Sequence, residues 1–223
     1  MRRRGKAEAI GIQGAGAGGM LRRLFLLSPA STSGKRARIL LSPGARFELA
    51  LRVRSEGASI GDVFAFLSGL YFRGKLTYAR HFAGPGSAIR VITSDRGLVP
   101  PELPLGHLDL RTMAKGDIDP DHPPYRLPLE RDAAALARQL DPTAEVVLLG
   151  SIATGKYAEI LHEAFGERLK FPELFVGRGD MSRGGLLLRA VRDNAELSYC
   201  CWKGAVVKGT RPPKLQPIRW SQS

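Results

Sequence analysis

"EVVLLGSIATGKYAEILHEAF" (residues 145–165) joins an apolar run to a helical pattern through a short turn rich in glycine and serine. Residues 145–150 predict a buried strand, and residues 156–165 repeat apolar side chains at helical spacing. A buried strand that leads directly into an amphipathic helix is the repeating unit of a parallel sheet. This stretch therefore predicts an α/β fold.

The same alternation continues along the chain. Further strands are expected at 23–31, 88–94, 169–177 and 196–202, and helices at 35–54, at 128–140 and from about 181. Residues 59–83 predict two helices joined through "SGLYFRG" (68–74). The proline-rich residues 101–127 predict a long irregular connection. We expect a three-layer sandwich, in which a small and mainly parallel sheet carries helices on both faces.

The charge divides the chain into a core and two basic ends. Residues 1–19 carry four basic residues and one acid, and residues 203–223 carry five basic residues and no acid, out of a net charge of +13. We expect a disordered extension at 1–19, one domain at 20–202 and a flexible basic tail at 203–223. Basic ends favour nucleic acid or a nucleotide as the partner.

Composition also argues against several classes of protein. No apolar run approaches the roughly 18 residues that cross a bilayer, so no membrane partner and a cytoplasmic location are expected. The only two cysteines, Cys200 and Cys201, are adjacent, which suits neither a disulfide framework nor a metal site. The four histidines show no ligand spacing, and we expect neither a metal nor a cofactor.

Four loops should meet at one edge of the sheet, because ligands of parallel sheets bind beyond the carboxyl ends of the strands. These loops are "SPAST" (28–32), "SDRG" (94–97), "GSIATG" (150–155) and "GRGDMSRGG" (177–185). Their candidate ligand-binding residues are Ser28, Ser31, Ser94, Arg96, Gly150, Ser151, Lys156, Tyr157, Gly177, Arg178, Gly179, Ser182 and Arg183. Helix capping explains the hydroxyls of the first loop equally well.

The turn "GSIATGKY" (150–157) nearly matches a phosphate-cradling loop of nucleotide hydrolases, but Tyr157 stands where a hydroxyl would bind magnesium. We favour a tight turn that lines a ligand pocket, with a purely structural turn as the alternative. The free N–H groups at the start of the following helix can still hold an anion.

"GRGDMSRGG" combines backbone freedom with two arginines that suit phosphate or carboxylate. Asp180 is the first candidate catalytic carboxylate and also a plausible N-cap of the next helix, and Asp95 is the second candidate. The glycines inside the first helical turn indicate close approach of another element or a ligand. The alternative is a capped turn with solvated arginines.

"LYFRGKLTYAR" (70–80) interleaves aromatic and basic side chains. Arg73, Lys75 and Arg80 are candidate contacts to a nucleic-acid backbone, whereas the aromatic residues fit a core.

The order of short motifs resembles bacterial proteins that are distantly similar to the peroxide-stress proteins of the YaaA type. The resemblance rests on Ser28-Pro29-Ala30, on Tyr125-Arg126-Leu127 and on Tyr157, and spans about residues 22–190. It implies DNA binding and protection, and a fold that has been compared with base-excising enzymes. The helix-hairpin-helix of those stress proteins is not evident in this sequence, and the resemblance transfers no catalytic residue.

Together these observations favour a protein that binds a nucleotide or nucleic acid in a pocket at the strand ends. If it is an enzyme, the expected reaction is at an N-glycosidic bond, as in base excision or deoxyribosyl transfer, with Asp180 as the carboxylate and Arg178 and Arg183 as the phosphate clamp. The alternatives are a non-catalytic DNA- or RNA-binding stress-response protein and an interaction module without a ligand.

Overall fold

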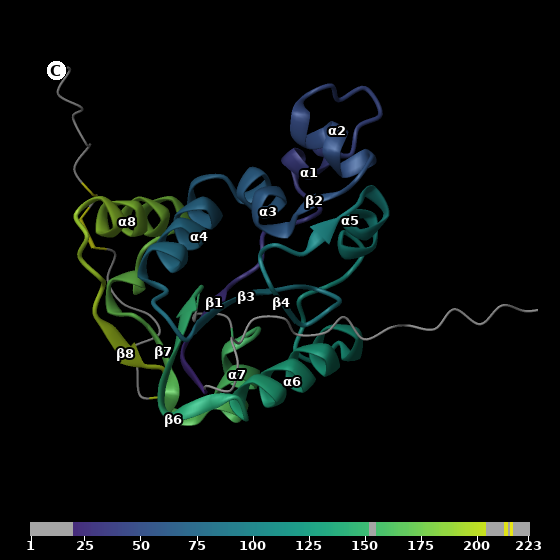
Figure 1. The fold of residues 1–223 in the computed structure, drawn as a ribbon. Coiled ribbons are helices and arrows are strands. Elements are labelled where there is room, and N and C mark those ends of the chain that lie inside the picture. The colour runs from purple at the N-terminus through teal and green to yellow at the C-terminus, as the bar shows by residue number, and fades with distance from the viewer. Residues whose placement is uncertain (1–19, 152–154, 204–211, 214, 216–223) are drawn as a thin grey trace, which may run out of the picture.

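A computed structural model describes residues 20–151, 155–203, 212, 213 and 215 (Figure 1). Its centre is a six-stranded sheet in the order β4-β3-β1-β6-β7-β8. The strands are β1 (Leu21–Leu27), β3 (Ser87–Ile92), β4 (Leu98–Val99), β6 (Leu140–Leu149), β7 (Leu169–Pro172) and β8 (Tyr199–Cys201). The four inner strands are parallel and the two edge strands antiparallel, which confirms the predicted mainly parallel sheet.

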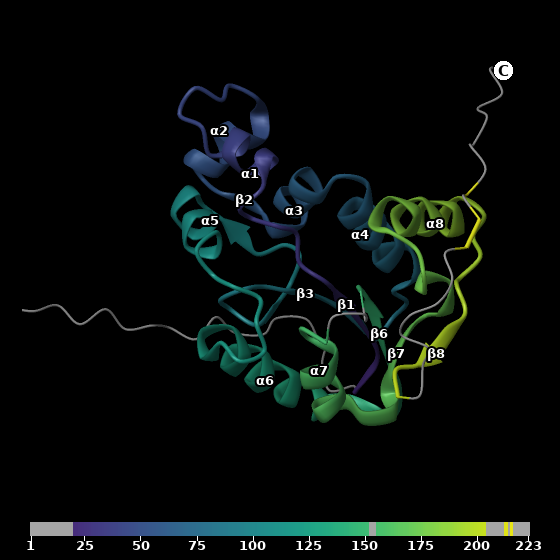
Figure 2. The ribbon, with the colours of Figure 1, turned by 180° about the vertical axis from the view of Figure 1, so that it is seen from behind.

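Helices cover both faces of the sheet, so the three predicted layers are confirmed (Figures 1 and 2). One face carries α3 (Ile60–Ser68), α4 (Leu70–Phe82) and α8 (Asp180–Arg192), and the other carries α6 (Pro123–Ala137) and α7 (Ala158–Phe165). A hydrophobic core lies on each face of the sheet, and side chains of β1 point alternately into the two. Phe25 and Leu27 belong to the first core, and Leu24 and Leu26 belong to the second. All four side chains are fully buried.

A smaller group of elements extends the first core beyond the sheet. It contains α1 (Lys35–Leu40), α2 (Glu48–Arg54), α5 (His107–Met113) and an antiparallel pair of β2 (Ala58–Ser59) with β5 (Pro104–Leu105). The prediction of an irregular connection over 101–127 was wrong, because β5, α5 and the start of α6 lie in it. These elements are too short to show periodicity, yet Leu105, Leu110 and Met113 bury completely in the first core.

Helix α6 begins five residues before the expected position. Pro123 and Pro124 occupy its first turn, where the N–H that proline lacks has no partner inside the helix. Pro128, which we expected in the first turn, therefore lies inside the helix.

Helices α4 and α8 cross at unusually close range through two glycines. A Cβ atom on Gly184 would lie 2.8 Å from the Leu70 carbonyl oxygen and 2.9 Å from the Tyr71 Cα, and one on Gly74 would lie 2.9 Å from the Gly184 carbonyl oxygen. Real Cβ atoms do not approach backbone so closely, so neither position accepts a side chain without movement. This explains the glycine inside the first turns of α8, and it brings the start of α8 against the side chains of α4.

None of the described helices has the length and apolar character needed to cross a membrane. The extension at 1–19 and most of the tail at 203–223 lie outside the described residues.

Candidate functional site at the carboxyl edge of the sheet

The parallel strands end together, so the loops that follow β1, β3, β6 and β7 share one edge. Leu27 at the end of β1 pairs with Val91 of β3 and with Leu149 of β6. Ser28 and Gly150, the next residues, therefore lie side by side at the centre of this edge. The side chains gathered here, Ser28, Tyr71, Lys75, Tyr157, Asp180 and Arg183, are called the edge cluster below.

Lys75 enters the edge cluster from α4 and is only 1% exposed. Its Nζ donates hydrogen bonds to the Ser28 carbonyl oxygen at 2.6 Å and to the Ser28 Oγ at 2.8 Å. The same nitrogen lies 4.4 Å from the ring centroid of Tyr71 and 4.9 Å from that of Phe72. The prediction that Lys75 contacts a nucleic-acid backbone was wrong, because this buried amine does not reach the surface.

Burial dominates the proton affinity of Lys75. It lowers the pKa of the amine to about 7, with a further lowering by the charge of Arg183 and an opposing increase from the carboxylate of Asp180. Lys75 makes no ion pair with any carboxylate among the described residues. At neutral pH a large fraction of this side chain is therefore an uncharged amine.

Tyr157 also contacts Ser28, through its hydroxyl. Its hydroxyl forms hydrogen bonds with the Ser28 side chain and the Ser151 backbone, while burial raises its pKa to about 12. A Cβ atom on Gly150 would lie 2.8 Å from both the Tyr157 hydroxyl and the Ser28 Cβ. Glycine at this position is therefore what allows the tyrosine to reach the serine.

The turn at 150–157 is described only in part. Residues 152–154 lie outside the described residues, and Lys156 is exposed. The carbonyl oxygen of Lys156 accepts a hydrogen bond from the Tyr125 hydroxyl at 3.1 Å, which ties the turn to α6.

Arg183 and Tyr71 form the third side of the edge cluster. Arg183 is 8% exposed, donates through Nε to the Phe175 carbonyl oxygen at 3.1 Å and places Nη1 3.6 Å from the Asp180 Oδ1. The Tyr71 hydroxyl is buried and has no hydrogen-bond partner of good geometry among the described residues. Burial raises its pKa, and the nearby Arg183 lowers it by a smaller amount.

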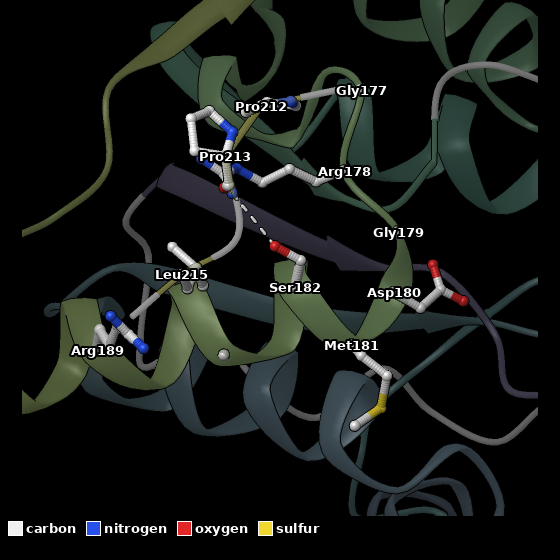
Figure 3. A pocket seen from close by; sticks show the side chains of 11 residues that line it. Gly177, Arg178, Gly179, Asp180, Met181, Ser182, Arg189, Pro212, Pro213 and Leu215 are labelled. Atoms are coloured by element: carbon white, nitrogen blue, oxygen red, sulfur yellow. Dashed lines mark hydrogen bonds between the residues drawn. The ribbon is translucent and has the colours of Figure 1, made fainter. Parts of the chain in front are cut away.

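In the loop "GRGDMSRGG", Asp180 lies near Arg183, whereas Arg178 has other partners. The N-cap of α8 is Gly179, not Asp180 as predicted, and the Asp180 side chain makes no capping hydrogen bond. Figure 3 shows the Asp180 carboxylate directed away from Arg178 and Ser182. Arg178 instead donates through Nη1 to the Ser182 Oγ at 3.2 Å and to the Pro213 carbonyl oxygen at 3.3 Å. Gly177, at φ 70°, does use the left-handed conformation that favours glycine.

A hollow of about 650 Å³ lies beside this loop on the outer side of α8 (Figure 3). It is lined by Gly177, Arg178, Gly179, Asp180, Met181, Ser182, Gly185, Arg189, Pro212, Pro213 and Leu215. Leu215 packs here, with Cδ1 3.5 Å from the place of a Cβ on Gly185. Pro212, Pro213 and Leu215 of the tail therefore lie against the domain, whereas we expect a flexible tail from the sequence.

The other candidate carboxylate belongs to a separate group of side chains. Asp95 pairs with Arg96 at 3.2 Å, and Arg96 also lies 3.2 Å from Asp109 on α5. The Ser94 hydroxyl donates to the Met113 carbonyl oxygen at 3.1 Å, so it holds α5 in place. Ser31, the remaining candidate of the first loop, is exposed.

The two other basic candidates of α4 do lie on the surface. Arg73 and Arg80 line a shallow hollow of about 520 Å³ together with His81. Arg80 also pairs with Glu102 at 3.2 Å.

Sequence reasoning missed Tyr71 and the inward position of Lys75. The spacing of α4 indicates the inward position of Lys75. This residue lies four positions after Tyr71 and four before Ala79, on the same helix face, and both of those residues are buried.

No group of three or more histidine, cysteine or acidic side chains among the described residues is arranged to hold a metal ion. No family model matches the chain, and neither a curated protein nor a solved structure matches it. The resemblance to the YaaA-type proteins stays a prediction.

Proposed function

We propose that this protein binds a nucleotide, or a nucleotide unit of a nucleic acid, at the edge cluster and acts on its N-glycosidic bond. The observation that carries the proposal is an imbalance of charge. Among the described residues, two buried basic side chains, Lys75 and Arg183, lie near one carboxylate, Asp180, whose side chain is 69% exposed, and burial leaves part of the Lys75 amine uncharged at neutral pH.

An anionic group supplies what the edge cluster lacks. Burying cations without a full complement of negative charge costs free energy, and a phosphate would offset that cost. Arg183 is the best placed clamp, because a guanidinium has five N–H donors and the described contacts occupy only some of them. The Tyr71 hydroxyl, which has no hydrogen-bond partner of good geometry among the described residues, is a further group for a sugar or base to contact.

The reaction class follows from the carboxylate. Asp180 stands at the first turn of α8 with its side chain largely exposed, where it is open to a ligand held by Arg183. A carboxylate so placed stabilises positive charge that develops on a sugar ring, or activates water, as the bond to the base breaks. Asp95 is the weaker candidate because Arg96 already neutralises it.

The alternative function is nucleic-acid binding without catalysis. It is favoured by Arg73 and Arg80, which are exposed two helical turns apart on α4 beside a hollow. Such side chains neutralise backbone phosphates and do not require the edge cluster.

Calorimetric titration with adenosine monophosphate tests the binding site. Arg183→Met keeps the apolar stem but removes the charge, and should weaken binding by 1.5–3 kcal/mol, about tenfold to more than a hundredfold. Arg192→Met, at the exposed far end of the same helix, is the matched control and should bind like the parent. Equal binding by all three proteins would refute a phosphate site at Arg183.

Chromatographic assay of released base tests the reaction. Asp180→Asn should bind the nucleotide like the parent and release base roughly a hundred times more slowly. Tight binding to the parent without base release from mononucleotide, DNA or RNA would favour the non-catalytic alternative.

A further inference from the structure

We propose that Ser28 and Lys75 form a nucleophile and base pair, and that the protein hydrolyses activated carboxylic esters through an acyl-serine intermediate. This activity uses side chains of the same edge cluster but does not require a bound nucleotide.

The two reacting groups are already in hydrogen-bonding contact. The Lys75 Nζ lies 2.8 Å from the Ser28 Oγ, within the roughly 2.6–3.2 Å that proton transfer to a base requires. The amine also donates a hydrogen bond of 2.6 Å to the Ser28 carbonyl oxygen, which helps to fix its position. The serine stands directly after the central strand β1, on a rigid element rather than a long loop.

The surroundings of Lys75 favour its uncharged form, which a base must have. The rings of Tyr71 and Phe72 cover the amine from α4. The charged groups that act on it are Asp180 and Arg183 of α8, whose effects oppose each other, while burial lowers the pKa to about 7. The lone pair is therefore available at neutral pH, as it is not in a surface lysine.

Tyr157 completes the arrangement as a proton donor. Its hydroxyl is hydrogen-bonded to the Ser28 side chain, and its pKa of about 12 keeps it protonated at neutral pH. Gly150 leaves the space for this contact. Two other serines of the candidate loops have different partners among the described residues: Ser94 donates to a carbonyl oxygen, and Ser182 accepts from Arg178.

The reaction needs only the ester and water. The Ser28 hydroxyl proton moves to the Lys75 amine as Oγ bonds to the carbonyl carbon. The bond from that carbon to the alcohol oxygen then breaks, and the alcohol leaves with the electron pair. It takes a proton from Lys75 directly, or from Tyr157, which Lys75 then reprotonates, so the amine is neutral again. Water attacks the acyl-serine, its proton passes to Lys75, and Ser28 leaves as the hydroxyl while the acid is released.

Ser28 is 6% exposed and Lys75 1%, so a small probe is the appropriate test. The protein is treated with phenylmethanesulfonyl fluoride, and the modified residue is mapped by mass spectrometry. The hydrolysis of p-nitrophenyl acetate is followed in parallel. We expect one sulfonyl group on Ser28, and at least a hundredfold slower labelling and hydrolysis in Ser28→Ala and Lys75→Met. Ser55→Ala, at the exposed end of α2, should react like the parent.

If Lys75→Met does not fold, the role of Lys75 is tested in the parent instead, by measuring the rate of Ser28 labelling as a function of pH. The rate should rise to a plateau with a midpoint near pH 7, because Lys75 titrates there. A rate that climbs without a plateau through pH 9, labelling at another residue, or labelling of folded Lys75→Met at the parent rate would each overturn the proposal.

Discussion

Replacing Lys75 by methionine should change how the stability of the protein depends on pH. Methionine fills a similar volume among the Tyr71 and Phe72 rings but does not titrate. The amine has a pKa of about 7 in the folded protein and 10.5 as its ordinary value. Between these values the unfolded chain binds the proton and the folded protein does not, so rising pH favours the folded protein.

The sign and size follow from that window. The cost of burying the charge is present in full below pH 7 and declines as the pH rises toward 10.5. From pH 7 to pH 9 the free energy of unfolding of the parent should increase by about 2 kcal/mol relative to Lys75→Met, at 1.36 kcal/mol per pKa unit. Groups whose pKa the substitution does not change contribute equally to both proteins. Their contributions therefore cancel when the two free energies of unfolding are subtracted.

Urea unfolding followed by circular dichroism, at half-unit steps of pH, measures this difference. Lys115→Met, the same substitution at an exposed position, reports any effect of the change of residue alone. A difference between parent and Lys75→Met that stays constant from pH 7 to pH 9 would refute the lowered pKa and, with it, the uncharged amine in the edge cluster.

Three other predictions test the packing and the charged ends. Gly184→Ala should destabilise the protein by about 1–3 kcal/mol in urea unfolding, because its Cβ would meet the backbone of α4, whereas Gly185→Ala, with nothing nearer than 3.5 Å, should be neutral or stabilising. Asp180→Asn should change the free energy of unfolding by less than about 0.5 kcal/mol, because this exposed side chain does not cap α8, and a larger loss would restore the capping role. Deleting residues 203–223 removes five positive charges, so any nucleic-acid binding should become less dependent on salt, and an unchanged salt dependence would place that binding on the domain itself.

The arrangement of the sheet was predictable because its strands are long apolar runs next to amphipathic helices. Residues 145–165 alone indicate a strand, a turn and a helix, and β6 and α7 are found there. The short elements β5 and α5 were not predictable, since two and seven residues do not establish a period. They form because Leu105 and Leu110 pack into the first core, a contact between distant parts of the chain that the local sequence does not indicate.

The candidate site was predictable only where it follows strands. Ser28, Gly150 and Tyr157 were expected at the carboxyl edge, and the structure brings them together. Lys75 was placed on the wrong face because lysine is almost never fully buried, so its residue type outweighed the spacing of α4. The spacing correctly indicates an inward position, since Lys75 shares the buried face of α4 with Tyr71 and Ala79.

Side chains that are close in the sequence do not all lie close together in the structure. Arg178 and Asp180 are two residues apart, yet α8 begins between them and the Asp180 carboxylate points away from Arg178. The close crossing through Gly184 and Gly74 is a tertiary contact. It brings Arg183 to Tyr71 of α4, a pairing that local sequence does not contain.

The central claim is that buried Lys75 and Arg183 of the edge cluster bind a negatively charged ligand. Nuclear magnetic resonance of protein with ¹³C-labelled lysine side chains, assigned with Lys75→Arg, measures the titration of Lys75 directly. We expect a midpoint near pH 7 in the free protein and a higher midpoint with saturating adenosine monophosphate, because the phosphate stabilises the ammonium form. A midpoint near 10.5 in the free protein, or one that the bound nucleotide does not move, would contradict the account.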